Sequence, residues 1–143
     1  METHIAAYIA GIMDGEGCFL IEKFATDRSP IGFQFRSSAQ LTMCEYDVIK
    51  CIADATNRHI QTKHLKSTRT AYVLVWRNRF AVEFINEIMP YLIGKKSQAA
   101  ILLAYEANIA PGRGRTYRPE DLARCESARK QLVALRLPVA PRC

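Results

Sequence analysis

Tyr8-Ile-Ala-Gly-Ile-Met-Asp-Gly-Glu-Gly17 is the stretch from which the fold of this 143-residue chain is best predicted. Apolar residues recur in it at helical spacing, and Thr3 is a suitable cap for the start of the helix. The glycines at the end of the stretch predict that the helix stops there. We expect Gly17 to supply a left-handed terminal residue.

Small residues occupy one face of this predicted helix. Ala7, Gly11 and Gly15 are spaced four residues apart, so they share that face. Gly11 destabilises a helix by about 1 kcal/mol relative to alanine, and some packing must offset this. A small-residue face allows a second backbone to approach closely, and a second copy of the chain is one such partner.

Two carboxylates, Asp14 and Glu16, stand at the C-terminal end of the same helix. The helix dipole is negative there, which disfavours each carboxylate by roughly 0.3–1 kcal/mol. A divalent cation removes the conflict, because Mg²⁺ commonly takes one or two carboxylates with waters and phosphate oxygens. If two helices pair by two-fold symmetry, a metal site forms at the dimer axis. The alternative is that both carboxylates are solvated and the glycines form an ordinary turn.

The rest of the chain alternates paired strands with helices. Strands are predicted at 18–24, 32–42, 58–66 and 69–77, and further helices at 45–56, 79–89, 95–108 and 120–136. The resulting order, α-β-β-α-β-β-α-α-α, indicates an α+β domain whose antiparallel sheet is covered on one face.

The predicted strand 32–42 has two distinct faces, because its residues alternate in character. The more apolar face carries Phe33, Phe35, Ser37, Ala39 and Leu41. The hydrogen-bonding face carries Gln34, Arg36, Ser38, Gln40 and Thr42. We therefore expect the first face to pack against helices and the second to be available to a partner.

Composition narrows the class of protein. A net charge of +6 favours a polyanionic partner, although many proteins of this charge bind nothing anionic. Five cysteines without a Cys-x-x-Cys pair argue against a disulfide framework. The chain has no apolar run of 18 residues and no secretory signal pattern at its start, so we expect an intracellular, soluble protein without a membrane span. An excess of Arg over Lys, 13 to 7, favours a bacterial or phage cytoplasm over an organelle.

The segment YIAGIMDGEG resembles the signature of the LAGLIDADG homing endonuclease family. The segment Pro90–Ala99, PYLIGKKSQA, looks like a second motif of that family, and the order of elements matches its core. The resemblance covers roughly residues 5–107. It implies a LAGLIDADG α-β-β-α-β-β-α core domain at 1–108 and a loop and helix extension of the same domain at 109–143. It also implies a concave antiparallel sheet that forms a saddle on double-stranded DNA.

The resemblance further implies a homodimer, because the chain carries one copy of the signature. Such proteins pair through the 1–17 helix and cut both strands of a long, nearly palindromic DNA site. By this likeness Ala7, Gly11, Asp14 and Gly15 lie at the dimer interface. The implied cofactor is Mg²⁺ (or Mn²⁺), with no small-molecule cofactor.

The family's catalytic roles transfer residue by residue. Glu16 matches the metal-binding acidic position, where Asp is commoner, and the Gly15 carbonyl matches a second metal ligand. Lys95 matches a basic residue beside the scissile phosphates. A polar residue that positions water falls on Met43 without gaps, so a small shift makes Gln40 or Thr42 its counterpart, or the residue is missing. Glu45 stands where a basic residue is common.

The sheet is the expected reader of DNA, since a β-ribbon fits the major groove and Arg and Gln bond base edges there. The candidates for base contact are Gln34, Arg36, Ser38, Gln40, Gln61, Lys63, Arg69 and Arg77. The candidates for phosphate contact are Lys66, Lys96, Arg113 and Arg115.

Two other functions stay open at this point. One is a nucleic-acid binder without cleavage activity on the same scaffold, such as an intron maturase or a transcriptional regulator. The other is an interaction domain that dimerises through its first helix.

Overall fold

The computed structural model describes residues 1–66, 68–108 and 117–136. Its helices are α1 (Thr3–Glu16), α2 (Tyr46–Thr56), α3 (Arg79–Ile88), the short 3-10 helix η1 (Met89–Tyr91), α4 (Lys96–Asn108) and α5 (Pro119–Ala134). Its strands are β1 (Gly17–Ala25), β2 (Phe33–Met43), β3 (Gln61–His64) and β4 (Thr70–Arg77). The predicted order of elements is confirmed, and the third strand is shorter than predicted.

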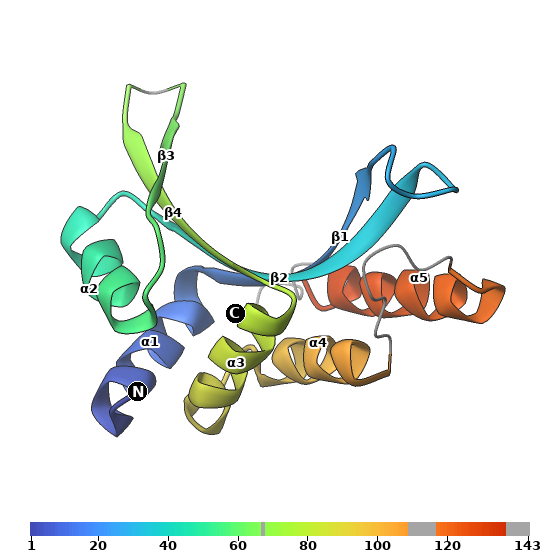
Figure 1. Cartoon of the computed structure of the whole chain (residues 1–143). Coiled ribbons are helices and arrows are strands. Elements are labelled where there is room, and N and C mark those ends of the chain that lie inside the picture. Colours follow the sequence, from blue (N-terminus) through green and yellow to red (C-terminus); the bar gives the residue numbers. More distant parts are fainter. Residues whose placement is uncertain (67, 109–116, 137–143) are drawn as a thin grey trace, which may run out of the picture.

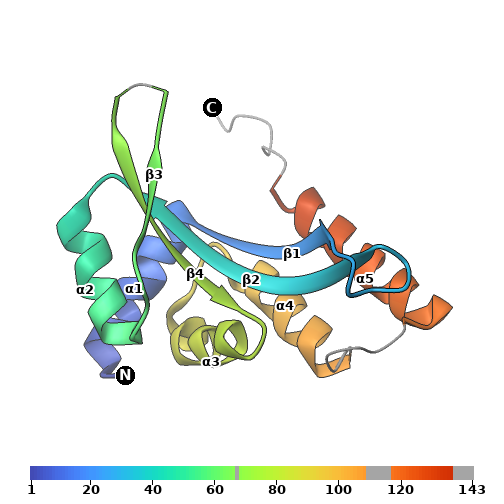
Figure 2. The same cartoon turned by 45° about the horizontal axis from the view of Figure 1, so that its top comes forward.

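The four strands form one antiparallel sheet in the order β1-β2-β4-β3. The sheet is strongly curved, and the helices lie on its convex side and at its flank (Figures 1 and 2). Its concave side faces away from them. The α+β class predicted from the order of elements and the saddle implied by the family resemblance are therefore both confirmed.

The main core lies between the convex side of the sheet and the helices. Trp76 of β4 is 1% exposed and stacks on Phe84 of α3, with ring centroids 3.9 Å apart. Phe35, Ala39 and Leu41, all from the predicted apolar face of β2, are buried. Burial of such side chains stabilises the fold by about 1.5–3 kcal/mol each. The alternation in the sequence thus fixes which face of the sheet points away from the helices.

Both ends of α1 differ from the prediction. Thr3 is the first residue of the helix rather than its cap, and the preceding Glu2 makes no side-chain capping bond. Gly17 has an extended backbone (φ −77°) rather than a left-handed one. A side chain at Gly17 would lie 2.8 Å from the Cα of Met13 and closer still to the Met13 side chain. Glycine is needed here for close packing between the helix end and β1.

The last helix, α5, closes a second apolar cluster against the sheet. Cys125 and Leu132 of α5 pack with Ile21, Phe35 and Tyr105. At its end, the guanidinium of Arg136 donates to the Phe19 carbonyl at 2.6 Å. Because β1 is an edge strand, this bond satisfies an outward-facing backbone acceptor.

No helix in the described part of the chain is long and apolar enough to span a bilayer.

Candidate nucleic-acid interface and metal site

The end of α1 is locked to the turn that precedes α4. The Asp14 carboxylate accepts hydrogen bonds from the backbone N–H groups of Ile93 and Lys95, each at 2.8 Å. In return, Lys95 Nζ donates to the carbonyls of Met13 (2.9 Å), Gly15 (3.4 Å) and Gly17 (2.6 Å). These contacts join segments that are about 80 residues apart in the sequence.

These contacts partly relieve the unfavourable placement of two carboxylates at the negative end of the α1 dipole. Lys95 places a positive charge at the negative end of the helix dipole. Burial raises the pKa of Asp14, but the N–H groups of Ile93, Lys95 and Gly94 and the charge of Lys95 outweigh it and hold that pKa below its ordinary value. Asp14 therefore acts within its own chain. Its place at the helix–helix interface stays a prediction.

Glu16 is different from Asp14, because its carboxylate has no partner among the described residues. It is the last residue of α1 and is exposed, and no described residue forms a hydrogen bond or ion pair with its side chain. The nearby Gly15 carbonyl accepts a long hydrogen bond of 3.4 Å from Lys95 Nζ, and a carbonyl oxygen has a second lone pair. A carboxylate and a carbonyl are oxygen ligands of the kind that Mg²⁺ binds, so the donor set fits such a cation. Within the described residues of one chain, no three His, Cys, Asp or Glu side chains gather as a complete metal site.

The small-residue face of α1 is exposed on the monomer. Ala7, Gly11 and Gly15 are all open to solvent, and Tyr8 beside them is 46% exposed. A Cβ atom added at Gly11 or at Gly15 would meet nothing within 4 Å. Packing within the described chain therefore does not explain these glycines, and a partner on this face remains their expected reason.

The concave side of the sheet carries the predicted hydrogen-bonding row of β2. Strand register also settles the orientation of the second hairpin, which the sequence left open. Gln40 is paired with Val75 and Ser38 with Arg77, while Gln61 and Lys63 pair with Val73 and Ala71. Paired residues share a face, so Arg77, Gln61 and Lys63 lie on the concave side with the β2 row. Lys66 and Arg69 are exposed near the tip of the hairpin.

Glu22 of β1, a carboxylate that was not among the sequence-based candidates, lies on this face beside the polar row of β2. It is paired with Arg36, whose Nε donates to Glu22 Oε2. Gln40 Nε2 donates to Glu22 Oε1 at 2.8 Å, and Arg77 Nε lies 3.8 Å from Glu22 Oε2. Successive residues of β1 point to opposite faces of the sheet, and pairing with Arg36 puts Glu22 on the same face as the polar row of β2. The position of Glu22 within the predicted strand 18–24 was the sequence signal that could have identified it.

Ser38 was predicted to be an exposed base contact, but the structure buries it. It lies on the concave side but is 0% exposed, beneath Gln40, whose Nε2 approaches its hydroxyl at 3.1 Å. Its role as a base contact is therefore corrected to support of Gln40.

The structure also bears on which residue could position water in the reaction, for which the sequence left Gln40, Thr42 or no residue. Met43 packs against the main core, so it offers no polar group to the site. Gln40 is bonded to Glu22 and Ser38, and no interaction links it to Glu16 in the described residues. Thr42 is exposed on the concave side. The structure thus brings Lys95 to the end of α1. Gln40 is paired with Cys18, two residues after Glu16, but its amide is engaged by Glu22 and Ser38, and its catalytic role stays a prediction.

The predicted phosphate contacts are placed only in part. Lys96 is exposed at the first turn of α4. Arg113 and Arg115 lie outside the described residues.

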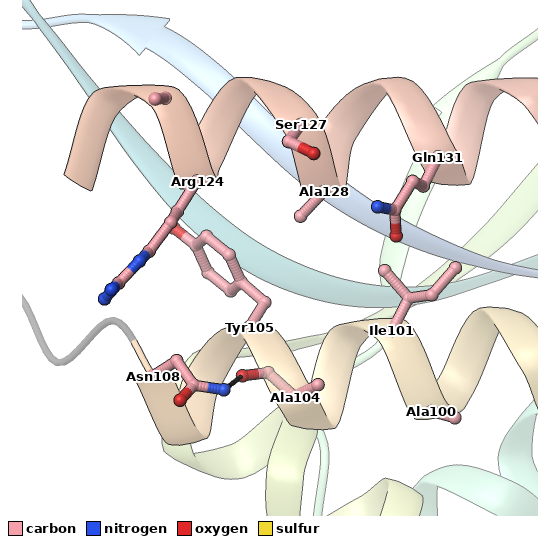
Figure 3. Close-up of a pocket in the computed structure, with 10 residues that line it drawn as sticks. Ala100, Ile101, Ala104, Tyr105, Asn108, Arg124, Ser127, Ala128 and Gln131 are labelled. Atoms are coloured by element: carbon pink, nitrogen blue, oxygen red, sulfur yellow. Dashed lines mark hydrogen bonds between the residues drawn. The ribbon is translucent and has the colours of Figure 1, made fainter. Parts of the chain in front are cut away.

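A separate hollow of about 750 Å³ lies between α4 and α5 (Figure 3). Tyr105 points from α4 toward α5, and alanines and Ile101 form much of the wall. Its described lining offers one charged group, Arg124, and otherwise neutral ones. The candidate chemistry is therefore at the end of α1 and on the concave face of the sheet.

Comparison with known proteins agrees with this geometry. The chain aligns over 100% of its length with the archaeal intron-encoded homing endonuclease I-Vdi141I, solved with DNA (TM-score 0.77, 18% identity, 91% of that chain). It aligns over 99% with the homing endonuclease I-CvuI, solved with the I-CreI target in the presence of Mg (0.75, 16%, 89% of that chain). The meganuclease I-SmaMI, also bound to DNA, matches at 0.70 and 15% identity, with 92% of this chain covering 45% of that one.

These identities are low, so the likeness to solved structures establishes the fold. No curated protein matches the sequence. The family model described as LAGLIDADG endonuclease matches residues 9–107, well over half of the chain. This protein therefore belongs to the LAGLIDADG endonuclease family.

Proposed function

We propose that this protein is a site-specific DNA endonuclease that acts as a homodimer and makes a metal-dependent double-strand break at a long, nearly palindromic site. One observation carries the proposal. The Glu16 carboxylate, which no residue in the described part of the chain engages, and the Lys95 ammonium both lie at the end of α1, where that helix joins the sheet. Family membership and the solved DNA complexes of similar folds support it.

Each residue at this site has a distinct role in the proposed reaction. Glu16 and the Gly15 carbonyl would hold Mg²⁺ or Mn²⁺, which supplies an activated water and charge stabilisation in phosphodiester hydrolysis. Lys95 keeps a positive charge beside the developing negative charge of the phosphoryl oxygens. Asp14 holds the backbone at Lys95 and at Ile93 before it, and so sets where the Lys95 ammonium lies.

Pairing through the exposed α1 face would bring two copies of this site together, one for each DNA strand. The concave faces would then form one continuous surface. The dimer's symmetry would be mirrored in the two halves of the DNA site.

The decisive test uses the DNA that spans the exon junction at the encoding locus, with the intron absent. Wild-type protein should cut both strands of this duplex only when Mg²⁺ or Mn²⁺ is added. Glu16→Gln should abolish cleavage and keep DNA binding within a few-fold, because the carboxylate touches metal rather than base edges. A Glu16→Gln protein that still cuts would refute the metal assignment.

A second function, DNA or RNA binding without cleavage, is favoured by one observation. Met43, which falls without gaps at the position of the family's water-positioning polar residue, is apolar and packs against the core. Specific retention of the same duplex without nicking, with or without Mg²⁺, would support this binder instead. The nuclease requires nicked product under the same conditions.

A further inference from the structure

The Glu22 cluster on the concave face has a defined hydrogen-bonding pattern. Its members are Glu22 of β1, Arg36, Ser38 and Gln40 of β2, and Arg77 of β4. The Glu22 side chain is only 23% exposed. A carboxylate that is largely shielded from water holds its partners more firmly than an exposed one, because solvent screening is weaker.

Arg36 is held on two sides. Its Nε is committed to Glu22 Oε2, and its guanidinium lies over the Phe24 ring, 4.5 Å from the centroid. Neither contact uses the two terminal nitrogens, Nη1 and Nη2, and none of the described residues hydrogen-bonds to them. Two parallel terminal N–H groups form the fork that recognises O6 and N7 of guanine in the major groove.

Gln40 is restricted in a complementary way. A carboxylate only accepts hydrogen bonds, so the Gln40 atom that faces Glu22 Oε1 at 2.8 Å must be the amide nitrogen. The same nitrogen faces the buried Ser38 hydroxyl at 3.1 Å. With its donor engaged, Gln40 has only its carbonyl oxygen left for DNA. It therefore cannot make the two-bond contact with adenine, which needs both a donor and an acceptor.

We propose that Glu22 is a positioning residue for base recognition: it aims Arg36 at a guanine and leaves Gln40 as a pure acceptor for an amino group of cytosine or adenine. This inference rests on the proposed function, since it requires that the concave face meets a DNA major groove. The carboxylate also repels phosphates, so it favours base contact over backbone contact by Arg36. Arg77, 3.8 Å from Glu22, supplies further positive charge to the cluster.

The experiment is selection of bound duplexes from a pool of randomised DNA, followed by sequencing. The full chain is used as wild type, Glu22→Gln, Glu22→Ala and Arg36→Lys. Glu83→Gln is the matched control, because it removes the same charge from α3, where Glu83 pairs with Arg79 on the helix side of the sheet. Circular dichroism melting confirms that each variant is folded, and Glu22→Gln keeps the shape of the side chain if Glu22→Ala is unstable.

Wild-type protein and Glu83→Gln should both prefer guanine at one symmetry-related pair of positions. The preference should be roughly 10- to 100-fold, as expected for a good bidentate contact. Arg36→Lys should lose it, and both Glu22 variants should reduce it to a few-fold at the same position. In the Glu22 variants, the preference at the Gln40 position should also broaden, since its amide is released.

Two contrary outcomes are distinguishable. If wild-type protein selects a defined sequence and both Glu22 variants select the same one equally sharply, the positioning role is wrong and the proposed function stands. If wild-type protein selects no sequence at all, site-specific recognition itself is refuted, and the role of Glu22 is refuted with it.

Discussion

Replacing Asp14 by alanine removes the carboxylate that ties the 93–95 turn to α1. Two hydrogen bonds of 2.8 Å are lost, from the backbone N–H groups of Ile93 and Lys95. A hydrogen bond to a charged group contributes about 1.5–3 kcal/mol when well shielded. Asp14 is half-buried and the freed N–H groups can bind water, so the loss should be about 2 kcal/mol in total.

The assay is urea and thermal unfolding at a fixed protein concentration, followed by circular dichroism. A loss of this size corresponds to a fall in Tm of about 6–8 °C for a chain of this length. Asp54→Ala is the matched control, because Asp54 forms an exposed i,i+4 pair with Lys50. That change should cost no more than about 0.5 kcal/mol.

The difference between wild type and Asp14→Ala should also depend on pH. The folded-state pKa of Asp14 lies below its ordinary value of 3.8, because backbone N–H groups and Lys95 outweigh burial. A lowered pKa contributes stability that is complete above the unfolded pKa and is lost as pH falls through the folded one. The stability gap should therefore be constant from neutral pH to about pH 5 and shrink below about pH 4. The reasoning would be refuted if Asp14→Ala were as stable as the control Asp54→Ala at pH 7. It would also be refuted if the stability difference between wild type and Asp14→Ala grew as the pH falls.

Three further outcomes are expected. Gly11→Leu should leave the monomer fold intact, because a Cβ there meets nothing within 4 Å, but it should abolish dimers in sedimentation velocity; an unchanged dimer would place the interface elsewhere. Leu132→Ala should lower the free energy of unfolding by about 2–5 kcal/mol, because this side chain is 1% exposed and packs with residues of β1 and α4. A loss below about 0.5 kcal/mol, typical of surface substitutions, would contradict that packing. DNA affinity should fall roughly 10³–10⁵-fold between 50 and 200 mM salt if about 6–10 phosphates are contacted, and a flat response would argue against groove binding.

The sequence by itself determined the elements and pointed to the candidate site. The alternation in 32–42 separated a core face from a polar face, because a strand presents successive side chains to opposite sides. Asp14 and Glu16 broke the helix-dipole rule within one turn, and the proposed site lies at that turn. Both signals are local: they depend on residues a few positions apart, whose geometry is set by the backbone alone.

Tertiary structure decided which of those residues are free to act. Asp14 and Glu16 look alike in the sequence, yet contacts from the 93–95 turn engage the first and leave the second open. Strand register placed Glu22 beside Arg36 on the concave face, and tertiary packing left Ser38 of the same face buried. These outcomes depend on contacts between segments far apart in the chain, and no local pattern encodes which donor will reach which acceptor.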